Sequence, residues 1–170
     1  MRTPLFDNEP YMRGEEEVIG NSRITYVETG PAVSVLPIRR ENDGMLYITL
    51  VEERGRSDTD QPLLKSPGGY LRGRDRETAA EEILKQKAGI TCGCLYALYE
   101  NMEGFTTIRL PIASYLVLQW TIISVGTAKR VEMLLDDAIE MVLKQEIRDQ
   151  HNADVIMRLA LLDERNRLPL

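Results

Sequence analysis

The sequence is organised around residues 65–90, KSPGGYLRGRDRETAAEEILKQKAGI. Pro67 cannot donate a hydrogen bond to a strand ladder, so we expect a strand to end there. Gly68 and Gly69 follow, and glycine allows positive φ and a close approach of the backbone. Good helix-forming residues occupy positions 78–88, and Gly89 stands where a helix commonly ends in a left-handed residue. The stretch therefore predicts a strand end, a glycine turn, a basic loop and one helix.

The composition fits one globular domain. The chain has 170 residues, 43% of them hydrophobic and 28% charged, which is enough to build a real core. Its net charge of −6 argues against a general nucleic-acid binder. No apolar run is long enough for a membrane span, and residues 1–20 lack the apolar core of a signal peptide. We therefore expect a cytoplasmic protein that has neither nucleic acid nor membrane as its partner.

Few residues are suited to soft-metal or thiol chemistry. Cys92 and Cys94 lie one residue apart, which is too close for an ordinary disulfide, and there is no second pair to complete a zinc site. We interpret both as plain strand cysteines. His151 is the single histidine, so the sequence offers no histidine-rich catalytic or metal site.

Alternating and β-rich runs predict most of the chain as strands. These runs cover residues 23–28, 32–39, 45–52, 91–100, 106–125 (broken by Pro111) and 131–135, with a turn at 101–105. Helices are expected at 78–88, at 136–145 after a cap by Asp136 and Asp137, and finally from Asp149 or Asn152 onward. This order predicts an α+β sandwich with mixed strands between helices. We expect residues 1–22 to form a partly ordered N-terminal arm and residues 23–170 to form a single domain.

The central stretch resembles the Nudix box, whose pattern is G-x5-E-x7-R-E-U-x-E-E-x-G-U, where U is aliphatic. The matching frame is Gly69, Ala79-Ala80, Leu84 and Gly89-Ile90, with the glycine-to-helix spacing one residue short. Residues 30–37, 50–54, 131–142 and 146–149 resemble segments of ADP-ribose pyrophosphatases in the same superfamily, so the likeness covers about residues 23–162. The resemblance implies a Nudix-type α/β/α sandwich with mixed β-sheets, metal-dependent hydrolysis of a nucleoside diphosphate derivative, and a homodimer formed through N-terminal strands.

The acidic residues of the family pattern are missing here. The three box glutamates that hold divalent metal in the family fall on Ile83, Gln86 and Lys87, and residues 83–89 contain no carboxylate. Hard cations such as Mg²⁺ need oxygen ligands. The resemblance also implies a catalytic glutamate on the loop at residues 126–130, but that loop has no acid and Glu132 follows within an expected strand. The chain thus resembles a pyrophosphohydrolase that lacks its box glutamates. We assign no catalytic residue and expect no cofactor.

Basic residues and glycines near the box are the candidate ligand-binding residues. Arginine forks and lysines suit phosphate, although each of these positions also fits a plain surface or helix-end role. The predicted substrate-binding set is Arg54, Arg56, Gly68, Gly69, Arg72, Arg74 and Lys87.

Three functional hypotheses follow. The first is a Nudix-fold protein that has lost hydrolysis and binds a nucleoside-diphosphate-type ligand or another protein. The second is an active hydrolase with a rearranged site, in which Glu77, Glu81 and Glu82 hold Mg²⁺ or Mn²⁺ and the metal activates water. The third is a purely structural interaction subunit.

Overall fold

A computed structural model of the chain describes residues 2–8, 12–54, 62–103 and 108–170. Its helices are α1 (Arg76–Ala88), α2 (Leu135–Leu143) and α3 (Gln150–Glu164). Its strands are β1 (Arg2–Asn8), β2 (Met12–Ile19), β3 (Ser22–Thr29), β4 (Ala32–Arg40), β5 (Leu46–Arg54), β6 (Pro62–Lys65), β7 (Gly68–Tyr70), β8 (Ile90–Thr91), β9 (Cys94–Glu103), β10 (Ile108–Leu118), β11 (Thr121–Ile122) and β12 (Lys129–Leu134).

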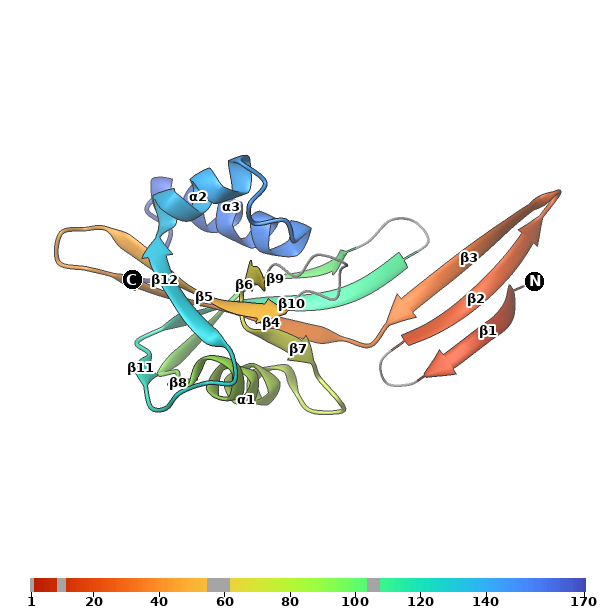
Figure 1. The fold of residues 1–170 in the computed structure, drawn as a ribbon, viewed down its shortest axis with the longest axis horizontal. Coiled ribbons are helices and arrows are strands. Elements are labelled where there is room, and N and C mark those ends of the chain that lie inside the picture. Colours follow the sequence, from red (N-terminus) through yellow and green to blue (C-terminus); the bar gives the residue numbers. More distant parts are fainter. Residues whose placement is uncertain (1, 9–11, 55–61, 104–107) are drawn as a thin grey trace.

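One large mixed sheet runs through the molecule. In the described part of the chain its order is β1-β2-β3-β10-β4-β5-β12, while β9 pairs with β10, β7 with β4 and β6 with β5. β10 runs parallel to both β3 and β4, and it runs antiparallel to β9. Helix α1 covers one face of this sheet, and α2 and α3 cover the other (Figure 1). The predicted α+β sandwich with mixed strands is therefore confirmed.

Successive side chains of the central strands point to opposite faces of the sheet, so they pack into two separate cores. On β4, Val33 and Val35 pack with the buried face of α1, while Leu36 and Ile38 pack on the α2 and α3 side. This is the pattern expected of a strand buried on both faces. None of the helices in the described ranges is long and apolar enough to cross a membrane.

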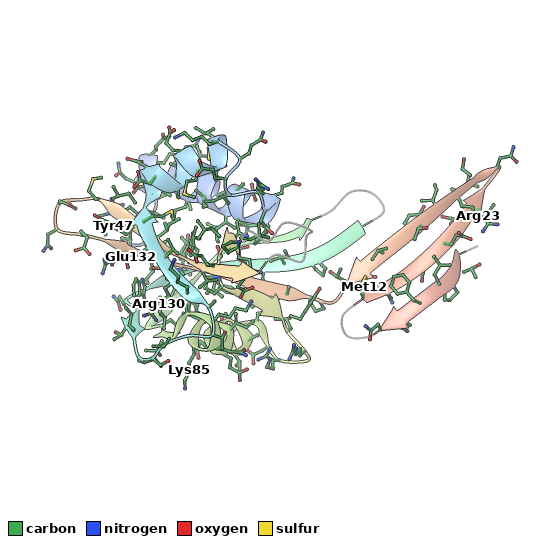
Figure 2. All side chains as sticks on the ribbon, viewed as in Figure 1. Met12, Arg23, Tyr47, Lys85, Arg130 and Glu132 are labelled. Carbon is green, nitrogen blue, oxygen red and sulfur yellow. The ribbon has the colours of Figure 1, made fainter. Side chains whose placement is uncertain are left out.

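The N-terminal segment contains more regular structure than the expected arm. Within residues 2–8 and 12–19 it forms β1 and β2, and β2 pairs along its whole length with β3. The strand predicted at 23–28 is confirmed as β3. Strands β1, β2 and β3 extend away from the body of the molecule. Met12 lies near the base of this extension, and Arg23 lies at its far end (Figure 2). The domain boundary after residue 22 stays a prediction.

Several predicted element boundaries were wrong for identifiable reasons. Pro111 does not break its strand, because β10 changes partner there: it pairs with β3 up to Arg109 and with β4 from Ile112. β9 also continues to Glu103 where a turn was expected. Asp136 and Asp137 do not cap α2. They lie in its first turn, where their charge suits the helix dipole, and Leu134 is the N-cap residue without a side-chain bond.

Candidate functional site

Helix α1 is fixed at both ends by residues of the box-like stretch. The Asp75 side chain accepts a hydrogen bond from the backbone N–H of Thr78 at 2.9 Å, so the helix begins at Arg76, two residues before the predicted start. Gly89 ends the helix in the left-handed conformation, with φ of 66°. The predicted helix and its glycine cap are therefore confirmed.

The glycine pair lets β7 lie close both to β4, its neighbour in the sheet, and to α1, which covers the sheet. A Cβ at Gly68 would lie 3.0 Å from the carbonyl oxygen of Val33. A Cβ at Gly69 would lie 3.1 Å from Cδ1 of Ile83, which is itself buried on α1. The structure thus explains both glycines by tight packing of backbone and helix. Their predicted contact with a ligand stays a prediction.

Lys87 of α1 meets a carboxylate from the sheet. Its Nζ lies 2.6 Å from Oε1 of Glu53, and Nζ of Lys65 lies 2.6 Å from Oε2 of the same carboxylate. The side chains of these three residues are only 21–30% exposed. Burial raises the pKa of Glu53, but the hydrogen bonds and charges of the two lysines outweigh burial and leave that pKa below its ordinary value.

Arg74 joins the loop before α1 to the helix. Its guanidinium pairs with the carboxylate of Glu82, and its Nε and Nη2 donate to the carbonyl oxygens of Leu71 and Tyr70 at 2.8 and 3.1 Å. These three partners hold the loop against the helix, so Arg74 has a structural role in addition to its predicted ligand contact.

The loop at residues 123–128 covers the C-terminal end of α1. Thr127 N and Ala128 N donate to the carbonyl oxygens of Gln86 and Lys87 at 2.9 and 3.1 Å. The guanidinium of Arg130, on β12, donates to the carbonyl oxygen of Ala88. Helix ends leave such carbonyls without partners, so this loop and Arg130 together satisfy the end of α1.

Glu132 is the first acidic residue after that loop in the sequence, and its side chain is engaged away from the end of α1. It lies on β12 as the register partner of Thr49, and its carboxylate pairs with Arg39. The guanidinium of Arg39 also lies 5.6 Å from the ring centroid of Tyr47 and 5.8 Å from that of Trp120. Tyr47 and Glu132 lie close together at this end of the sheet, away from Lys85 of α1 (Figure 2).

The structure describes only some of the remaining predicted residues. Arg56 and the side chain of Arg54 lie outside the described residues. Arg72 is an exposed loop residue with φ of 52°. Glu77 is exposed in the first turn of α1, and the thiol of Cys92 donates to Oε1 of Glu81 at 3.8 Å.

The carboxylate of Glu82, the third of these glutamates, is paired with Arg74. Throughout the described part of the chain, no three His, Cys, Asp or Glu side chains form a group that could hold a metal ion.

Glu53 and Lys65 were not among the residues predicted from the sequence. The signal was available for Glu53, because alternation along β5 places it on the same face as Val51, which packs against α1. For Lys65 the register was needed, since it is the partner of Val51 on β6 and so shares that face. Neither register nor the helix position follows from the local sequence.

The sheet enclosed between α1 on one face and α2 and α3 on the other is a Nudix-type fold. A solved structure described as "Crystal structure of ADP compounds hydrolase" superposes on this chain with a TM-score of 0.70 at 16% sequence identity, covering 98% of this chain and 97% of that one. At this identity the likeness concerns the fold. A scan of protein-family models finds no match, and a search of curated proteins finds none either.

Proposed function

We propose that this chain is a Nudix-fold protein that binds a nucleoside-diphosphate-type ligand and does not hydrolyse it. The fold supports the ligand class, because the superposable solved structure is named as a hydrolase of ADP compounds. The side chains on α1 support the loss of hydrolysis.

The observation that carries the proposal is the ion pair between Lys87 and Glu53. The family pattern, counted back from Gly89, puts its three metal-holding glutamates at Ile83, Gln86 and Lys87. Ile83 is buried among apolar side chains, and Lys87 presents an ammonium held by Glu53. A hydrocarbon, an amide and an ammonium do not fit Mg²⁺ or Mn²⁺, which take carboxylate and other oxygen ligands. No hydrolytic step that depends on a metal can be assigned to these residues.

The remaining positions of the box support the derivation of this chain from the Nudix pattern. Counting back from Gly89 places the first glycine of the pattern on Gly68, so the spacing is complete and the one-residue deficit inferred from Gly69 was an error. The same count places the first glutamate of the pattern on Arg74 and its arginine on Glu82. These two residues form an ion pair, so the opposite charges of the pattern are present in reversed order.

We also infer that the chain forms the homodimer expected from the resemblance. β1 lies at one end of the sheet order, and a terminal strand offers backbone groups to another chain. Large apolar side chains on β1 and β2 are exposed: Leu5 is 50%, Phe6 43%, Val18 58% and Ile19 56% exposed. Sedimentation equilibrium tests this, because a Val18→Lys, Ile19→Lys double variant should be monomeric where the unmodified chain is a dimer.

A thermal-shift and turnover experiment tests the proposed function. ADP-ribose and related nucleotides are added with Mg²⁺, with Mn²⁺ or with EDTA, and melting and product formation are measured on the same samples. A ligand at 100 times its Kd stabilises the folded state by about 2.7 kcal/mol, which is readily seen as a raised Tm. We expect stabilisation without product. Clear turnover that disappears in the Glu82→Gln variant would refute the proposal in favour of a rearranged metal site, and no shift with any nucleotide would favour a structural subunit.

A further inference from the structure

One carboxylate beneath α1 holds two ammonium groups. Glu53 contacts Lys65 from β6 through one oxygen and Lys87 from α1 through the other, each at 2.6 Å. Two positive charges therefore face one negative charge in this cluster. Each ammonium has three N–H donors, and one carboxylate cannot satisfy all six.

The sheet adds a third cation on the same face. Val51 packs against α1, and its register partners on the two neighbouring strands are Lys65 on β6 and Arg130 on β12. Register partners point to the same side of a sheet, so Lys65 and Arg130 flank Val51 on the α1 face. Arg130 is occupied by the carbonyl oxygens of Ala88 and Ser124, but its charge adds to the positive potential.

The negative C-terminal end of α1 does not cancel the positive charge of these three residues. Lys87 lies in the last turn of α1, where unpaired carbonyls would repel an anion. Here the carbonyl oxygens of Gln86 and Lys87 accept from Thr127 and Ala128, and that of Gly89 accepts from Ile123 and Ser124. The negative end of the helix is thus covered by donors.

We propose that Lys65 and Lys87, held side by side by Glu53, bind the oxygens of a metal-free diphosphate, with the two ammonium groups taking the place of a divalent cation. This inference rests on the proposed function and adds the binding residues and the metal dependence. Lysine binds phosphate as a point charge, and a diphosphate carries enough oxygens to contact both ammonium groups. Glu53 acts as a positioning residue that keeps the two ammonium groups close together before the ligand arrives.

The charges at this site predict that a divalent cation weakens the binding of a diphosphate. A divalent cation bound to the diphosphate reduces the negative charge of the ligand and is repelled by the lysines. Binding should therefore persist in EDTA and weaken when magnesium saturates the ligand. A site that uses a bridging metal has the opposite dependence.

Calorimetric titration with inorganic pyrophosphate, using the full chain, tests the inference. In EDTA we expect binding to the unmodified protein and a loss of roughly tenfold or more in affinity for Lys87→Gln and for Lys65→Gln, because each removes one charge-assisted hydrogen bond. The matched control is Lys85→Gln, since Lys85 lies on the same helix and points away from the sheet (Figure 2), and its affinity should change by less than about threefold because exposed distant charges are screened. Lys87→Glu, which places a second carboxylate beside Glu53, should abolish binding in EDTA.

The outcomes separate this site from the broader proposal. Circular dichroism first verifies that each variant is folded, and Lys65→Gln carries the test if Lys87→Gln is not. Equal affinity of the Lys85, Lys65 and Lys87 variants, or binding that requires magnesium, overturns the inference. Binding of ADP-ribose or a related nucleotide without binding of pyrophosphate overturns this inference and leaves the proposed function intact, whereas binding of none of these ligands overturns both.

Discussion

Gly126 is the point at which the loop after β11 touches the end of α1. A Cβ on Gly126 would lie 2.0 Å from the carbonyl oxygen of Lys87 and 2.8 Å from the carbonyl carbon of Ala88. Both contacts are with backbone, so no flexible side chain can move aside. In the Gly126→Ala variant the loop must therefore shift away from the helix.

The cost of that shift can be estimated from the bonds it breaks. Thr127 N and Ala128 N donate to Gln86 O and Lys87 O at 2.9 and 3.1 Å, and both donors directly follow Gly126. A typical hydrogen bond contributes about 0.5–1.5 kcal/mol to stability, so losing two costs about 1–3 kcal/mol.

Urea unfolding followed by circular dichroism measures this difference in free energy of unfolding. The midpoint should fall for Gly126→Ala while the slope with urea stays unchanged, because the surface exposed on unfolding is nearly the same. Thr127→Ala is the matched control: the residue is exposed in the same loop, and its substitution should change stability by less than about 0.5 kcal/mol. If Gly126→Ala were as stable as the control variant, the close docking of this loop on α1 would be refuted.

Three further predictions concern charge and packing. Reversing the pair to Arg74→Glu with Glu82→Arg should recover part of the stability that either single change loses, with a coupling of about 0.5–1 kcal/mol in a double-mutant cycle, since the pair is partly exposed. Folding lowers the pKa of Glu53, so its contribution to stability is present above the ordinary carboxyl pKa of about 4.3 and is lost as pH falls through the lower folded value. The stability difference between the unmodified chain and Glu53→Gln, measured by urea unfolding, should therefore shrink on acidification; a difference that is constant with pH would contradict the pairing. Leu159→Ala, in the fully buried face of α3, should cost about 2–5 kcal/mol in the same assay, whereas Leu161→Ala, 49% exposed on the same helix, should cost far less; similar costs would show that α3 is packed differently.

The sequence was most informative where local chemistry determines local structure. The glycines at 68, 69 and 89 and the helix-forming run between them predicted α1 and its end cap, because glycine conformation and helix propensity act over a few residues. Lys87 was selected as a ligand-binding candidate from its place in that pattern. The structure places it in an ion pair, and its contact with a ligand stays a prediction.

The sequence was least informative where strand register decides the neighbours. Glu53 and Lys65 lie 34 and 22 residues before Lys87, and only the pairing of β5 with β6 beneath α1 brings the three charges together. Pro111 was interpreted as a strand break for the same reason, since whether a missing N–H matters depends on which strand lies beside it. The strands formed by residues 2–8 and 12–19 likewise depend on register, because β1 pairs with β2 and β2 pairs with β3.

Phosphorus NMR of ADP-ribose incubated with the full chain and Mg²⁺ tests most directly whether the protein binds a diphosphate without cleaving it. We predict diphosphate resonances that keep their full integrated intensity over time with Mg²⁺, and that shift or broaden with added protein in a parallel sample containing EDTA. Replacement of those resonances by the phosphomonoester signals of AMP and ribose phosphate, at a rate proportional to the protein added, would contradict this account.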